Sequence, residues 1–196
     1  MTTKAATLAA LLLSSSGIHA QSSEPPPGQR SIAIEADALS YGLDGFSGIA
    51  RWSLRNGLNV ALGAGRYDVP DFVVEDQDSF ELAQWQATAD SIQVLRIGYR
   101  FAPPLRNGAV VDGIVIDQRF DVTADRFGER TEFETRGIGI SGGYYFHVGK
   151  HLYLYPTGSI TRNEVRSGSN FVRGLEYDVP KTQLNLSLHV GWEWGF

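Results

Sequence analysis

The chain has 196 residues, a formal net charge of −5 and no cysteine. It is 42% hydrophobic and 11% aromatic but only 20% charged, which is the composition of a folded protein rather than a disordered one. The slightly acidic balance argues against nucleic-acid binding, because a DNA- or RNA-binding domain needs a basic surface. The absence of cysteine excludes a disulfide framework, a zinc–thiolate site and a cysteine nucleophile.

The first twenty residues have the order of a secretory signal peptide. A start that carries Lys4 is followed by the apolar residues 5–13, and small residues then lead to Ala20. The apolar stretch is too short for a membrane-spanning helix, which takes about 20 residues. We therefore predict that residues 1–20 are a signal peptide cleaved after Ala20. Residues 21–30 are rich in proline and serine, and we predict that they form a flexible lead-in.

Residues 31–196 show apolar alternation with a period of two, which is typical of strands with two different faces. The pattern is clearest at the end of the chain, where every second residue from Leu184 to Phe196 is apolar and the intervening residues are not. Looser alternation predicts seven further strands. The eight predicted strands span about residues 31–40, 46–55, 58–67, 89–101 (with a start at 85 left open), 113–122, 133–146, 151–162 and 181–196.

The links between these strands are of two lengths. Asn56-Gly57 predicts a two-residue type I′ hairpin turn, because both central positions of that turn need a positive φ. Short links also fall at 102–110 and 147–150, and longer polar links at 68–88, 123–132 and 163–177. Tight turns at one end and long loops at the other are typical of outer-membrane barrels. We therefore predict an all-β fold over residues 31–196, namely an eight-stranded antiparallel up-and-down transmembrane β-barrel.

Charged residues fall on one face of nearly every predicted strand. In a membrane barrel the apolar face meets lipid and the charges fill the lumen, whereas in a soluble secreted barrel, the alternative, the apolar face is the core. Strands of about ten residues and aromatic residues at strand ends favour the membrane barrel. On the fifth strand this places Ile114 and Ile116 against lipid and Asp117 and Arg119 in the lumen. The predicted lumen charge network comprises Glu35, Asp37, Arg51, Arg96, Arg100, Asp117, Arg119 and Glu193, which we expect to pair in a narrow, filled interior.

The last strand carries a more specific signal. Val190, Trp192, Trp194 and Phe196 alternate up to the final residue. This ending resembles the C-terminal signal of Gram-negative outer-membrane proteins, and the mature chain resembles their small eight-stranded superfamily: the OmpA transmembrane domain, OmpX-type proteins and the opacity-type "porin family". The resemblance implies an integral outer-membrane protein whose last strand is recognised by the barrel assembly machinery. It also implies contact with outer-membrane lipid and lipopolysaccharide, a monomeric state and no nucleic-acid partner.

From this resemblance we expect a structural or surface-interaction role without enzymatic activity, cofactor or metal. One alternative is a narrow porin-like channel for small polar solutes. Another is a lipid A-modifying enzyme, which needs a base beside a nucleophile; Ser187 and His189 are the candidate pair on one face of the last strand. His147 and His151 flank a short turn that we place on the periplasmic side, away from the outer leaflet.

The longest link is acidic and has no lysine or arginine between positions 68 and 90. Its carboxylates include Asp68, Asp71, Glu75, Asp76, Asp78 and Glu81. Clustered carboxylates are ligands for calcium or magnesium, but their spacing is not that of a calcium loop. We therefore favour a solvated acidic loop over a cation site.

Overall fold

The computed structural model describes residues 29–196 except 43, 76 and 78. The predicted signal peptide, its cleavage site after Ala20 and most of the predicted lead-in lie outside the described residues. At the end of the lead-in, the Arg30 N–H donates to the Phe196 carbonyl at 3.0 Å, and the Phe196 N–H donates to the Arg30 carbonyl at 2.9 Å. The pairing of the two ends of the barrel thus begins one residue before the predicted domain boundary.

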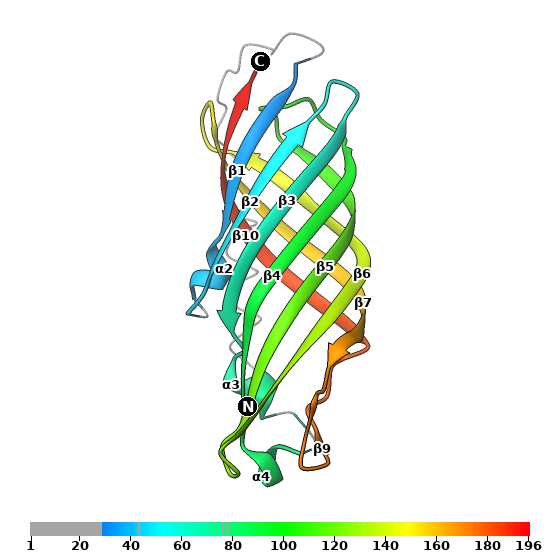
Figure 1. The fold of residues 1–196 in the computed structure, drawn as a ribbon. Helices are drawn as coiled ribbons and strands as arrows, with labels where there is room; N and C mark the ends of the chain where they lie inside the picture. The colour runs from blue at the N-terminus through cyan, green and yellow to red at the C-terminus, as the bar shows by residue number, and fades with distance from the viewer. Residues whose placement is uncertain (1–28, 43, 76, 78) are drawn as a thin grey trace.

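Eight strands of the described chain form one closed antiparallel barrel, as predicted (Figure 1). In chain order they are β1 (Ser31–Asp37), β2 (Phe46–Ser53), β3 (Leu58–Asp68), β4 (Trp85–Arg100), β5 (Gly108–Ala124), β6 (Glu129–His147), β7 (Leu152–Gly168) and β10 (Thr182–Gly195). Each strand pairs with the next along the barrel, and β1 pairs with β10 to close the sheet. This is the up-and-down order.

Shorter elements lie in the connections. They are α2 (Ala38–Tyr41) between β1 and β2, α3 (Asp71–Val74) and α4 (Phe80–Ala83) between β3 and β4, and the hairpin of β8 (Phe171–Val172) with β9 (Leu175–Glu176) between β7 and β10. Figure 1 shows α3, α4 and β9 at the end of the barrel far from the C-terminus. We call this the loop end and the opposite one the terminal end. No described helix is long and apolar enough to cross a membrane.

The turn after β2 differs from the predicted type. The Leu54 N–H donates to the Leu58 carbonyl at 2.8 Å, and the Gly57 N–H donates to the Leu54 carbonyl at 3.1 Å. Gly57 has a φ of 85°, whereas Asn56 does not have a positive φ. The connection is therefore a three-residue loop with a left-handed glycine at its end, and the type I′ prediction is wrong. A loop of this kind needs a positive φ at one position only.

The outer face of the barrel carries an apolar band. Leu184, Leu186 and Ile140 are 73%, 70% and 62% exposed on it, while alternate residues of the same strands are turned inward. At the loop end the band stops at charged residues on the outer face. They are Arg66 on β3, Asp90 on β4, Asp117 on β5, Arg136 on β6 and Arg162 on β7. The strands β4 to β7 continue beyond this border, which is why the observed strands exceed the predicted ones.

On β5 the predicted faces are reversed. Ile114 is 2% exposed and Val122 is fully buried, so they point into the barrel, while Asp117 and Arg119 point outward. The prediction assumed that polar residues face inward along the whole strand. Beyond the apolar band the outer face is polar instead. Polar residues of β5 therefore face inward within the band and outward beyond it.

Replacing Gly57 by alanine tests this account of the β2–β3 turn. An added Cβ would lie 2.6 Å from the Tyr99 ring and 2.9 Å from the Arg100 carbonyl oxygen, in addition to the unfavourable φ of 85°. We expect Gly57→Ala to lower the free energy of unfolding by about 2–3 kcal/mol. Gly128 has a φ of 64° but open space at its Cβ position, so Gly128→Ala should lose only about 1 kcal/mol. Urea unfolding followed by heat-dependent gel mobility measures both, and equal losses would contradict the steric part of the argument.

Candidate functional site: the barrel interior

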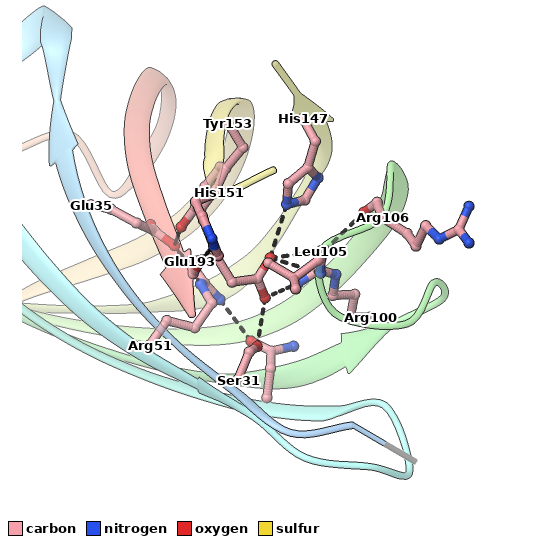
Figure 2. Close-up of polar contacts among 11 residues, drawn as sticks. Ser31, Glu35, Arg51, Arg100, Leu105, Arg106, His147, His151, Tyr153 and Glu193 are labelled. Carbon is pink, nitrogen blue, oxygen red and sulfur yellow. Dashed lines mark hydrogen bonds and ion pairs between the residues drawn. The ribbon is translucent and has the colours of Figure 1, made fainter. Parts of the chain in front are cut away.

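Glu193 on β10 is the centre of a buried cluster near the terminal end (Figure 2). Its carboxylate accepts hydrogen bonds from the Ser31 hydroxyl, from Arg100 Nη1 at 2.7 Å and from the Leu105 backbone N–H at 3.0 Å. His147 Nε2 lies 2.9 Å from the same carboxylate. Four separate segments of chain therefore converge on one fully buried acid, which fastens the turn at Leu105 to the first and last strands.

A second cluster lies deeper along the barrel around Arg51 on β2. Arg51 Nε donates to Glu35 Oε1 at 2.6 Å, and Nη1 donates to Asn59 Oδ1 at 2.6 Å. Asp112 Oδ2 lies 3.6 Å from Nη1, and the Tyr153 hydroxyl donates to Glu35 at 2.9 Å. Arg51, Glu35 and Asp112 are essentially inaccessible to solvent. Such charges are tolerable only because each has an opposite charge or a hydrogen-bond partner beside it.

Tyrosine rings join the two clusters. Tyr145 and Tyr155 stack with centroids 4.3 Å apart and an interplanar angle of 5°. The Arg100 guanidinium lies 4.2 Å from the Tyr145 centroid, and that of Arg51 lies 5.2 Å from the Tyr155 centroid. These cation–π contacts place two large side chains across an interior that eight strands make only wide enough for side chains. We call the Glu193 cluster, the Arg51 cluster and these tyrosines together the plug.

The structure does not bring the predicted lumen charges together in one network. Glu35 and Arg51 lie in one cluster of the plug, and Arg100 and Glu193 in the other. Arg96 is buried in the lumen, 6% exposed, with no carboxylate within ion-pair distance among the described residues. Asp37 ends β1 and caps α2: its carboxylate accepts from the Leu39 N–H at 3.0 Å and from the Ser40 hydroxyl at 3.2 Å.

The prediction of a lumen position is wrong for Asp117 and Arg119. Both lie on the outer face of β5 just beyond the apolar band, where each pairs with a residue of β6. Arg136 Nε contacts Asp117 Oδ1 at 2.6 Å, and Arg119 Nη2 contacts Glu134 Oε1 at 2.7 Å. The pairs are largely exposed to solvent. The hydrogen bond from Arg119 lowers the pKa of Glu134 from its ordinary value. We call these four residues, with the neighbouring Arg166, the outer collar.

Sequence reasoning missed several plug residues. Asn59, Asp112, Tyr145, Tyr153 and Tyr155 are all buried in the lumen. Asp112 lies on β5 within the apolar band, and it shares a face with Ile114 because the two are two residues apart. Its charge could have shown that this face of β5 is the lumen face. Tyr153 and Tyr155 alternate with the outward residues Leu152 and Leu154, and Tyr145 lies between the outward residues Tyr144 and Phe146. Apolar or aromatic residues on both faces of a strand give no contrast to detect.

Between the plug and the loop end lies a cavity of about 430 Å³. Its lining includes the apolar side chains of Ile114, Ile116 and Phe120 as well as the polar side chains of Arg96 and His189. The buried nitrogens Nε and Nη1 of Arg96 and both ring nitrogens of His189 lack a hydrogen-bond partner among residues 29–196 as described. The cavity therefore combines a mostly apolar side on β4 and β5 with a set of unused polar groups.

Residues of the long loops and of the strand extensions beside them cover the cavity at the loop end. Trp85, Phe133 and Tyr177 pack together there, with the Trp85 and Tyr177 centroids 5.8 Å apart in an edge-to-face arrangement. Burial raises the pKa of Tyr177 to about 12. Gln77 joins two loops: its side chain donates to the Asp178 carbonyl at 3.2 Å and accepts from the Asp178 N–H at 2.6 Å. We call this covering layer the loop cap.

The enzymatic alternative receives no support from the Ser187–His189 pair. Both residues line the cavity, but in the described structure neither ring nitrogen of His189 is hydrogen-bonded to the Ser187 hydroxyl or to another described residue. His147 and His151 lie at the terminal end, where His147 contacts Glu193 and His151 Nδ1 lies 2.8 Å from the Glu193 carbonyl oxygen.

The acidic link is partly ordered by its own polar contacts. Asp68 accepts a hydrogen bond from the Thr88 hydroxyl at 2.9 Å, and Asp90 lies 3.9 Å from Arg66. Among the described residues, no group of three carboxylates or histidines is arranged to hold a metal ion, while Asp76 and Asp78 lie outside them.

The residues of the predicted assembly signal share the outer face of β10. Val190, Trp192, Trp194 and Phe196 are 38–65% exposed, and their strand pairs with β1 on one side and β7 on the other. Their side chains lie in the apolar band at the terminal end, together with Tyr99, Phe101, Tyr144 and Phe146.

Comparison with known proteins identifies the fold. No protein-family model and no curated protein matches the sequence. Among solved structures, the N-terminal β-barrel domain of Pseudomonas aeruginosa OprF is similar, with a TM-score of 0.53, 14% identity, and coverage of 85% of this chain and 98% of that one. A major outer-membrane protein of Thermus thermophilus is similar with a TM-score of 0.51, 14% identity, and coverage of 84% and 99%. The chain has the fold of the small eight-stranded outer-membrane barrels.

Replacing Glu193 tests the importance of the plug. Glu193→Gln keeps the side-chain shape but leaves Arg100 buried without its counter-charge, so we expect the free energy of unfolding to fall by about 3–5 kcal/mol. Glu134→Gln in the outer collar is the matched control, because it removes one carboxylate from an exposed pair of the same 2.7 Å length. The control should show no measurable change. Urea unfolding in detergent compares the two, and a small loss for Glu193→Gln would contradict the central role of this acid.

Proposed function

We propose that the chain is a monomeric, non-enzymatic integral protein of the Gram-negative outer membrane with a structural or surface-interaction role. The observation that carries the proposal is the combination of a closed barrel, an apolar outer band and a lumen that the paired charges of the plug close near the terminal end. We propose export by a signal peptide cleaved after Ala20. Outer-membrane lipid, lipopolysaccharide and the assembly machinery are the partners that this interpretation implies.

The dimensions of the apolar band support a membrane location. On β10 it runs from Leu184 to Trp194. Ten residue steps of about 3.4 Å along a strand tilted by about 45° give a height of roughly 24 Å, close to the ~25 Å band of outer-membrane barrels. In water, an exposed apolar surface this continuous around the barrel would drive aggregation. A soluble secreted barrel would have the opposite arrangement, with its apolar face inside.

The distribution of aromatic residues and loops supports an orientation. The exposed aromatic residues of the band gather near its terminal end, while the long loops and strand extensions lie at the other end. Outer-membrane barrels have short periplasmic turns and long extracellular loops. We therefore place the end of the barrel where Arg30 pairs with Phe196 in the periplasm and the loop cap outside the cell. The C-terminal residue Phe196 then lies at the periplasmic border, in position for recognition by the assembly machinery.

The plug argues against the channel alternative. A solute passing from end to end would have to separate Arg51 from Glu35 and the stacked tyrosines from both arginines. Breaking a buried ion pair without replacement costs about 3–5 kcal/mol. A stable barrier of this kind fits a protein that acts through its surface rather than by transport through its lumen.

The outer collar is the surface that supports contact with lipopolysaccharide. It lies at the loop-end border of the apolar band, at the level of lipid headgroups in the proposed orientation. A surface hollow there is lined by Arg119, Arg136 and Arg166 together with Asp117 and Glu134. Arginine binds phosphate groups in a bidentate manner, and the lipid A headgroup carries phosphates.

Two measurements test the proposal. Cell fractionation followed by gel electrophoresis should place the protein in the outer-membrane fraction and show that heating changes its migration, as for a folded barrel. In planar bilayers the purified protein should show essentially no conductance.

A Glu35→Ser/Arg51→Ser double variant, which removes both charges and most of their volume, should conduct if it keeps the heat-dependent migration. Open-pore currents from the unaltered protein would contradict the closed lumen, and a periplasmic location would contradict the membrane assignment.

A further inference from the structure

The wall of the barrel is incomplete beside the cavity. β1 pairs with β10 only from Ser31–Gly195 to Asp37–His189, whereas β10 continues to Thr182 along β7. Over residues 183–188, β10 therefore has a described strand partner on one side only. The link that follows β1 occupies this place, and α2 packs against β10 there (Figure 1).

The cavity reaches the outer face through this gap. Its lining includes Ser187 and His189, which face the lumen, but also Leu184 and Leu186, which lie on the outer face and are 70% or more exposed. Leu39 of α2 lines the same space and is 46% exposed. The lining residues of β10 run without a break from Gln183 to Ser187, so the cavity borders the edge of β10 that has no described strand partner. An unpaired strand edge at membrane depth is tolerated only where it borders a cavity or is covered by protein.

The interior end of this space is built for an anion. Arg96 is almost fully buried, yet Nε and Nη1 of its guanidinium have no hydrogen-bond partner among the described residues. Of the nearby acids, Asp37 caps α2, whereas Asp112 lies 3.6 Å from Arg51 and its carboxylate oxygens accept no hydrogen bond within the described chain. His189, 2% exposed, adds two unused ring nitrogens beside it. A guanidinium is a planar fork of charged donors; Nε and Nη1 lie on different edges of it, so a carboxylate oxygen can accept from either one of these free nitrogens.

One side of the cavity above Arg96 is mostly apolar, with Gln118 between Ile116 and Phe120, while polar residues of β6, β7 and β10 line the other side. Ile92 and Val94 on β4 and Ile114, Ile116 and Phe120 on β5 line the cavity from the level of Arg96 towards the loop cap. The six residue steps from Ile114 to Phe120 span about 20 Å along the strand. The volume of about 430 Å³ is within the range of ligand pockets, roughly 300–1,000 Å³. An apolar strip that ends at one cation fits a molecule with one long hydrocarbon chain and one acidic head.

We propose that this cavity binds a single-chain amphiphile with a carboxylate head, of the long-chain fatty acid class, which enters from the side between α2 and β10. The carboxylate accepts hydrogen bonds from Arg96 and His189, and the chain lies along the apolar strip of β4 and β5. The plug closes the way to the terminal end, so the barrel holds the ligand without passing it through. That the entrance opens towards lipid rests on the proposed membrane location, whereas the binding site itself does not.

Binding is measured with cis-parinaric acid, a fluorescent long-chain carboxylate, and the purified barrel in detergent. The unaltered protein should bind it saturably at one site, and its methyl ester much more weakly. Arg96→Gln should weaken acid binding by about tenfold or more, as expected for the loss of a charged hydrogen bond. Arg96→Lys, which keeps the charge but not the fork, should be intermediate. Arg162→Gln on the outer face of β7 is the control and should bind like the unaltered protein.

The side entrance is tested through the kinetics. Because the chain has no cysteine, Leu186→Cys can be labelled at one position with a bulky maleimide. The label should slow association and dissociation several-fold with little change in affinity. Ile140→Cys, similarly exposed on β6 rather than β10, is the matched control and should leave the rates unchanged.

Three results would overturn the inference: no saturable binding, equal binding by folded Arg96→Gln, or unchanged rates for labelled Leu186→Cys. Heat-dependent migration shows which variants are folded. If Arg96→Gln does not fold, binding by Arg96→Lys tests the role of Arg96 instead. None of these results bears on fractionation or bilayer conductance, so failure of this inference is distinguishable from failure of the proposed function.

Discussion

Pairing between the first and last strands is the contact on which the rest of the structure depends. Seven residues of β1 meet β10 in register, and the Arg30–Phe196 hydrogen bonds extend this seam to the end of the chain. Once the sheet is closed, every strand has one face turned inward and one outward. The period-two sequence then separates an apolar outer surface from an interior that must accommodate charges. Without closure, Glu193 on β10 could not meet Arg100 on β4, because these strands are not neighbours in the sheet.

The interior is divided along its length, and each part has its own chemistry. Near the chain ends, the plug satisfies its charges with ion pairs and stacked tyrosines, and it holds the barrel closed. Towards the loops, the side chains become apolar, space remains, and Arg96 and His189 keep unused polar groups. The short β1 leaves the wall open beside that space. A barrier at one end and a side entrance near the other suit a protein that retains a ligand or presents a surface, not one that conducts.

Much of this could be predicted from the sequence, because alternation and turn residues report directly on strands. The eight strands, their antiparallel order and the lumen positions of Glu35 and Glu193 follow from that pattern. It failed for Asp117 and Arg119 because polarity marks the lumen only within the apolar band; beyond it the outer face is polar and the inner face is apolar. Burial of Tyr145 and the gap beside β10 depend on strand register and on where β1 ends, which local sequence does not reveal.

The account rests on which face of the sheet meets lipid, and two adjacent residues of β6 test it most directly. In this cysteine-free chain, Ile140 points outward and is 62% exposed, while Ser141 points inward and is 3% exposed. Nitroxide labels at Ile140→Cys and Ser141→Cys in lipid vesicles report access to oxygen, which concentrates in lipid, and to a water-soluble nickel chelate. The account predicts strong oxygen access at position 140 and little at 141. Strong nickel access at position 140 would contradict it and would mean that the apolar face does not lie against a membrane.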